Sequence, residues 1–68
     1  MKLSARNQFV GKVVEIKEGS VNAIVKIEIA KDIVITSTIS MDSVKELALK
    51  VGSEATAVVK ATSVMVMV

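Results

Sequence analysis

The stretch VNAIVKIEI, residues 21–29, decides the fold class because its apolar and polar side chains alternate. Every odd position is apolar, whereas Asn22, Lys26 and Glu28 fall on even positions. Successive side chains of a β-strand point to opposite faces of its sheet, so a period of two predicts a strand with one buried face. We therefore expect a β-strand over Val21–Ile29.

A second strand is predicted just before this one, over Phe9–Lys17. The turn Glu18-Gly19-Ser20 joins the two strands as an antiparallel hairpin, because a glycine can adopt the positive φ that such turns need. Gly11 lies inside the earlier strand, where a glycine usually marks a bulge or a sharp bend. Such a bend would allow a small sheet to curl into a barrel.

A third strand and one short helix are predicted after residue 31. The turn Lys31-Asp32 precedes a strand over Ile33–Ser40, whose side chains change from Ile and Val to Thr and Ser along its length. The helix is indicated by apolar residues that share one helical face, namely Met41, Val44, Leu47 and Ala48. Either Ser40 or Ser43 could cap its N-terminus, the second in a Ser-x-x-Glu box with Glu46.

Two further strands complete the predicted fold, one over Glu54–Ala61 and one over Val64–Val68. The order β-β-β-α-β-β predicts an all-β fold with one short helix, a five-stranded Greek-key barrel of the OB-fold kind, in a single domain over residues 1–68. The last strand is apolar on both faces, so one face would lie in the core and the other against a neighbouring subunit.

The apolar content exceeds what one core of this size can bury. Of 68 residues, 51% are hydrophobic, whereas a monomer this short hides only about 60% of the surface that its unfolded chain exposes. Small domains are otherwise supported by disulfides or structural metals, but the chain has no Cys and no His. Self-association is therefore predicted.

The composition also argues against several classes of function. Without His or Cys there is no common general base, thiol nucleophile or soft-metal ligand, so we expect neither an enzyme nor a cation site. The first eight residues contain no apolar core of a signal peptide, which favours the cytoplasm. The longest apolar run, Val64–Val68, is far shorter than the roughly 20 residues of a membrane helix.

Two short segments are rich in hydrogen-bond donors and lack acidic residues. Ser4-Ala5-Arg6-Asn7 precedes the first strand, and Lys60-Ala61-Thr62-Ser63 lies between the last two strands. A tetrahedral oxyanion offers only acceptors, so its site needs N–H and O–H donors, some of them cationic, and no competing carboxylate. Both segments meet this requirement, although residue types alone leave ordinary turns as an equal alternative.

The chain resembles the molbindins, small molybdate-binding proteins also named molybdenum-pterin-binding proteins, with a TOBE/OB-like domain. The resemblance covers essentially the whole chain and rests on three groups of segments in the same order: SARNQ (4–8) with GKV (11–13), TSTIS (36–40) with DSV (42–44), and VVKAT (58–62). It implies an OB-like fold, hexamers assembled as trimers of dimers, and oxyanions held at subunit interfaces.

The resemblance also implies which residues hold the anion, molybdate or tungstate, with no organic cofactor. It places Ser4, Ala5, Arg6, Lys60 and Ala61 at the anion, with Ser40 approaching from a partner subunit. Asn7, Thr62 and Ser63 are second-tier candidates. Ala5 and Ala61 can act only through backbone N–H groups, whereas Arg6 and Lys60 supply positive charge.

Two rival functions remain open at this point. An OB-fold domain that binds single-stranded nucleic acid would share the fold and the basic pI of about 9.2. Such domains stack bases on aromatic rings, however, and the chain has only Phe9, with no Trp or Tyr. A purely structural oligomer is the other rival, in which the donor-rich segments would be ordinary turns.

Overall fold

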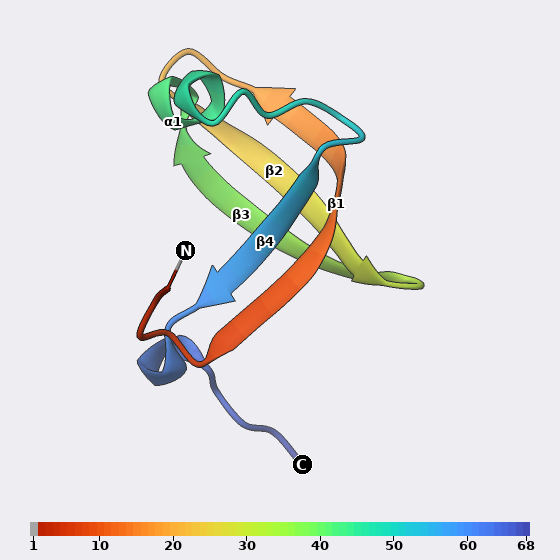
Figure 1. The fold of residues 1–68 in the computed structure, drawn as a ribbon, viewed down its shortest axis with the longest axis vertical. Helices are drawn as coiled ribbons and strands as arrows, with labels where there is room; N and C mark the ends of the chain where they lie inside the picture. The colour runs from red at the N-terminus through yellow and green to blue at the C-terminus, as the bar shows by residue number, and fades with distance from the viewer. Residues whose placement is uncertain (1) are drawn as a thin grey trace.

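Four β-strands form one antiparallel sheet in the computed structural model, which describes residues 2–68 (Figure 1). The strands are β1 (Asn7–Glu18), β2 (Asn22–Ala30), β3 (Ile33–Ser40) and β4 (Glu54–Val59), in the spatial order β3-β2-β1-β4. A short helix, α1 (Met41–Glu46), lies between β3 and β4 in the chain. The predicted all-β class, with one helix between the third and fourth strands, is confirmed.

The long strand β1 serves two partners in succession, and this makes the sheet curl. Its first half pairs with β4, from Asn7 opposite Val59 to Lys12 opposite Glu54, and its second half pairs with β2. Gly11 lies where the partners change, and a bulge with Val14 as the extra residue follows. The sheet curls into a half-barrel as expected, but the bulge lies at Val14 and not at Gly11 (Figure 1).

The core lies on the concave side of this sheet. Alternate residues of β2 are buried, namely Ala23, Val25 and Ile27, as the period of two predicts. Val13, Val44 and Ala57 complete the buried cluster.

The N-cap of α1 is Ser40 rather than Ser43. The Ser40 Oγ accepts a hydrogen bond from the Ser43 backbone N–H at 3.1 Å, which is the geometry of an N-cap. The helix ends at Glu46, and Ala48 has a positive φ of 52°. The prediction that Leu47 and Ala48 share the apolar face of this helix is therefore wrong. The helix ends before Leu47, and the Leu47 side chain is exposed. No helix among residues 2–68 is long and apolar enough to span a membrane.

The prediction of a fifth strand over Val64–Val68 is wrong for the single chain. β4 is followed by the 3-10 turn η1 (Ala61–Ser63), after which residues 64–68 run away from the sheet with exposed side chains (Figure 1). A strand exists only where a second strand accepts its backbone hydrogen bonds, and this segment has none within residues 2–68. The barrel therefore stays open between the outer edges of β3 and β4.

Candidate anion-binding site

The two donor-rich segments lie side by side at one end of the molecule. Because β1 and β4 are antiparallel and Asn7 pairs with Val59, the residues before β1 meet the residues after β4. Together they border an open hollow of about 600 Å³, which we call the terminal hollow. Its lining consists of Ser4, Ala5, Arg6, Val58, Lys60, Ala61 and Thr62.

The first segment is held in place by Gln8. The Gln8 side-chain Nε2 donates a hydrogen bond to the Ala5 carbonyl oxygen at 2.7 Å, which fixes the chain as it enters β1. Sequence reasoning assigned no role to Gln8. The signal available was its place three residues after Ala5, where a side-chain amide can reach back to a backbone carbonyl.

The second segment is a tight turn. The Ser63 N–H donates to the Lys60 carbonyl at 2.8 Å, and the Val64 N–H donates to the Ala61 carbonyl at 3.3 Å. The N–H groups that begin such a turn have no carbonyl of the turn itself to bond. The backbone N–H groups of Ala61 and Thr62 therefore have no partner within this turn, and both residues line the terminal hollow together with Lys60.

The charge of the terminal hollow is entirely positive among the lining residues described. Arg6 and Lys60 are its cations, Ser4 and Thr62 contribute hydroxyl groups, and no carboxylate lines it. All four of these residues are exposed in the single chain. The hollow therefore has the donors that an oxyanion needs, but a single chain leaves it open to water.

Three of the predicted site residues do not line this hollow. Asn7 is the first residue of β1 and is half-buried in its pairing with Val59, and Ser63 closes the turn η1. Ser40 lies at the opposite end of the half-barrel, where it caps α1 (Figure 1). Val58 lines the hollow although sequence reasoning did not include it. Residues 2–68 contain no group of three or more His, Cys, Asp or Glu placed to hold a metal ion.

Comparisons with known proteins agree with this fold. The TOBE domain family matches residues 3–66. A probable molybdenum-pterin-binding protein of Haemophilus influenzae is 64% identical over 66 residues, which are 97% of this chain and 96% of the relative.

Solved structures give the same picture. MopII from Clostridium pasteurianum superposes with a TM-score of 0.92 at 57% identity, covering 98% of this chain and 100% of that one. The cytoplasmic molybdate-binding protein ModG, solved with molybdate bound, has a TM-score of 0.85 at 44% identity, covering 90% of this chain and 43% of that one.

An open OB-like half-barrel with a cationic, carboxylate-free hollow at one end defines a small ligand-binding domain. The chain belongs to the TOBE domain family and, within it, to the molybdenum-pterin-binding proteins or molbindins.

Proposed function

We propose that this protein binds molybdate or tungstate in the terminal hollow and that it stores the anion in the cytoplasm without catalysing a reaction. The observation that carries the proposal is that two cationic residues, Arg6 and Lys60, line the same hollow, whose described lining has no carboxylate. A tetrahedral dianion is the complementary ligand, because it accepts hydrogen bonds on every side and balances two positive charges.

Backbone groups complete the proposed coordination. Ala5 and Ala61 carry no polar side-chain atom, so in this proposal their backbone N–H groups orient the anion. Arg6 and Lys60 supply the positive charge that balances it. Ser4 and Thr62 add hydroxyl donors within the same lining. Because oxygen acceptors on molybdate and tungstate have nearly the same arrangement, both anions suit this donor set.

The site is proposed to be completed by a neighbouring subunit of a homo-oligomer, a hexamer built as a trimer of dimers. The single chain exposes 5672 Å², whereas a compact monomer of its 7.2 kDa is expected to expose about 4,100 Å². The excess supports burial of a large area between subunits. Ser40 lies at the end of its half-barrel opposite the terminal hollow and does not reach it. In this proposal it approaches the terminal hollow of a partner subunit instead.

Two further observations support the cellular setting. The chain has no Cys, which fits a reducing compartment. The structural relative ModG is itself described as cytoplasmic.

Thermal unfolding tests the proposal. Molybdate that binds the folded assembly and not the unfolded chain must raise Tm, and at about 100 times Kd it adds roughly 2.7 kcal/mol per independent site to the free energy of unfolding. A Tm that does not change with millimolar molybdate would contradict it.

A further inference from the structure

Residues 4–6 border the terminal hollow without belonging to a helix or a strand. The chain bends at Ser4 and again at Arg6, and β1 begins at the next residue, Asn7 (Figure 1). A segment outside regular secondary structure has many accessible backbone conformations, and fixing one of them costs conformational entropy. The donors of this segment therefore need a contact that holds them in place.

One side-chain hydrogen bond supplies that contact. The Gln8 Nε2 donates to the Ala5 carbonyl oxygen at 2.7 Å, and among residues 2–68 this is the one hydrogen bond that the structure gives to residues 2–5. Ala5 is half-buried, whereas Ser4 and Arg6 are exposed. The bond therefore fixes the middle of the segment, between the residues that carry the hydroxyl group and the guanidinium.

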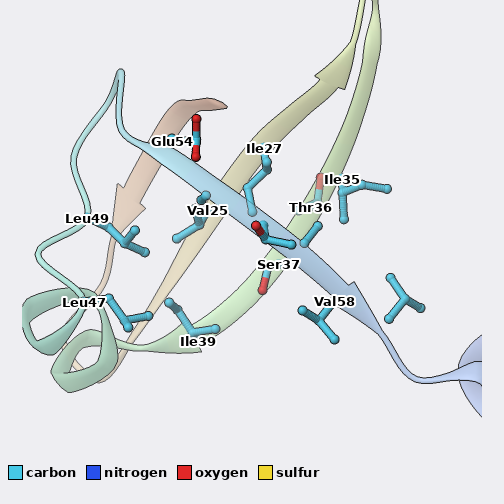
Figure 2. Close-up of a pocket in the computed structure, with 14 residues that line it drawn as sticks. Val25, Ile27, Ile35, Thr36, Ser37, Ile39, Leu47, Leu49, Glu54 and Val58 are labelled. Atoms are coloured by element: carbon cyan, nitrogen blue, oxygen red, sulfur yellow. The ribbon is translucent and has the colours of Figure 1, made fainter. Parts of the chain in front are cut away.

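Gln8 is itself anchored in the sheet. It is the second residue of β1 and lies opposite Val58 of β4 in the antiparallel register. Val58 lines the terminal hollow and also the apolar pocket between β3 and β4, where Figure 2 shows its side chain beside β4. Opposite residues of an antiparallel pair have their side chains on the same face of the sheet. Gln8 therefore stands beside a residue of the hollow, although it is not among the lining residues itself.

The Gln8 bond sets the direction of one peptide group. A trans peptide is planar, so its C=O and its N–H point in opposite directions. The Ala5 carbonyl shares its peptide group with the Arg6 N–H, and the Gln8 amide therefore sets the direction of that N–H as well. A hydrogen bond to the carbonyl also polarises the peptide group and makes its N–H a stronger donor. Gln8 thus acts on a donor of the anion segment from outside the hollow.

The same bond withdraws an acceptor from the segment. A free Ala5 carbonyl oxygen would repel an oxyanion that carries no proton, because both groups only accept hydrogen bonds. The free oxygen would instead favour an oxyanion that still carries a proton, such as hydrogen phosphate, because the O–H of that anion can donate to it. A carbonyl oxygen held toward Gln8 is removed from both interactions.

We infer that Gln8 is a positioning residue that makes the terminal hollow selective for oxyanions without a proton. It holds the Ala5 carbonyl toward β1, so that residues 4–6 offer donors alone to the anion. Molybdate, tungstate and sulfate carry no proton at neutral pH, whereas phosphate does, and discrimination against phosphate therefore depends on Gln8. This inference rests on the anion site proposed above and concerns how that site selects its ligand.

Gln8→Met tests the inference, because Met has a similar length but no N–H donor. Sulfate and phosphate at about pH 8 are tetrahedral dianions of nearly the same size that differ by one proton, so the ratio of the phosphate Kd to the sulfate Kd isolates the effect of that proton. Both are measured calorimetrically by displacement of molybdate. The ratio should exceed one in the natural chain and fall about 2- to 12-fold in Gln8→Met, the effect of one ordinary hydrogen bond. The molybdate Kd should rise by a similar factor.

Two further variants separate positioning from a general effect on the fold. Gln8→Lys again has a donor of similar reach, and its added charge acts equally on two dianions, so it should restore the natural ratio. Val10→Met places the same residue on the same face of β1, outside the lining of the hollow, and should leave the ratio unchanged. A ratio that falls equally in Gln8→Met and Val10→Met, or that Gln8→Lys does not restore, would overturn the inference.

The Gln8 amide can also be followed in the natural chain, where it is the only glutamine. With isotope-labelled glutamine, its side chain gives one isolated pair of amide signals in NMR spectra. Molybdate should shift these signals and slow their exchange with water, because a bound anion makes the segment open less often. Signals that saturating molybdate leaves unchanged would overturn the inference, even where a Gln8 variant fails to fold.

The molybdate titration of the natural chain separates this inference from the proposed function. If the natural chain binds no molybdate, the proposed function fails and Gln8 has no anion segment to position. If the natural chain binds molybdate, and Gln8→Met keeps both the natural molybdate Kd and the natural ratio, only the role of Gln8 is overturned.

Discussion

Gly11 of β1 and Glu28 of β2 approach so closely that a methyl group at Gly11 would overlap the Glu28 carbonyl oxygen. The same methyl group would lie 2.9 Å from the Ile27 Cγ2, which belongs to the buried core. The contact falls where β1 changes its partner from β4 to β2. A residue without a side chain is therefore what permits β1 to cross β2 at this point and the sheet to curl.

Replacement of Gly11 by alanine should lower the free energy of unfolding by about 1–3 kcal/mol, the usual cost of overpacking. Alanine loses less conformational entropy than glycine on folding, a gain of roughly 0.5–1 kcal/mol, but overlap with a backbone oxygen outweighs it. Urea unfolding monitored by circular dichroism measures the change. Lys12→Ala, at the neighbouring exposed position, is the control and should stay within about 0.5 kcal/mol of the natural chain. Equal stability of Gly11→Ala would show that β1 and β2 separate easily.

Two substitutions at Ser40 separate its role as the N-cap of α1 from its proposed role at the anion of a partner subunit. Ser40→Ala removes the N-cap of α1 and should lower the free energy of unfolding by about 1 kcal/mol. Ser40→Asp keeps a capping side chain but places a carboxylate where the proposal brings Ser40 to a partner's anion. Because like charges oppose each other, its molybdate affinity should fall at least tenfold, measured by calorimetry. Natural affinity in Ser40→Asp would leave Ser40 as a helix cap only.

Lys60→Ala should weaken molybdate binding while the protein remains assembled. Loss of a charge-assisted hydrogen bond to a dianion costs about 1.5–3 kcal/mol, which corresponds to a roughly 10- to 150-fold higher Kd. The ligand-free assembly should not suffer, because the empty hollow holds Arg6 and Lys60 with no described counterion among its lining residues. Lys31→Ala, a lysine outside this hollow, is the matched control. A molybdate-induced rise in Tm that is the same in Lys60→Ala and in the natural chain would show that this turn is not part of the site.

The two faces of residues 64–68 should differ in their tolerance of charge. In an extended segment the three valines share one face and the two methionines share the other. Stiff β-branched side chains pack well on the pleated surface of a sheet, whereas flexible Met side chains adapt more easily to a changed neighbour. Val66→Lys should therefore weaken the proposed homo-oligomer in sedimentation at micromolar concentration, and Met67→Lys should not. Equal effects of the two substitutions would contradict this assignment of faces.

Local patterns were sufficient to predict most of the fold. The alternation over residues 21–29 predicted β2, because burial of Ala23, Val25 and Ile27 on one face is a property of the strand itself. The choice between Ser40 and Ser43 as the helix cap could not be made from sequence, since both residues have a capping side chain. The hydrogen bond from the Ser43 N–H decides it.

Non-local relationships explain what the sequence did not predict. The pairing of Asn7 with Val59 places Arg6 beside the Lys60 turn, and no periodicity within either segment contains that information. Residues 64–68 have the composition of a buried strand, yet composition does not say which chain provides the partner. The error over the fifth strand therefore arises because an apolar pattern indicates a tendency to be buried but does not specify a pairing partner, and these side chains are exposed in the single chain.

Calorimetric titration of the assembled protein with molybdate tests the central claim most directly. Molybdate should give a saturable heat, tungstate should bind with a Kd within about tenfold of that of molybdate, and Lys60→Ala should shift the molybdate curve to a roughly 10- to 150-fold higher Kd. If the assembled natural protein gives no saturable heat with millimolar molybdate or tungstate, the terminal hollow is not an oxyanion site.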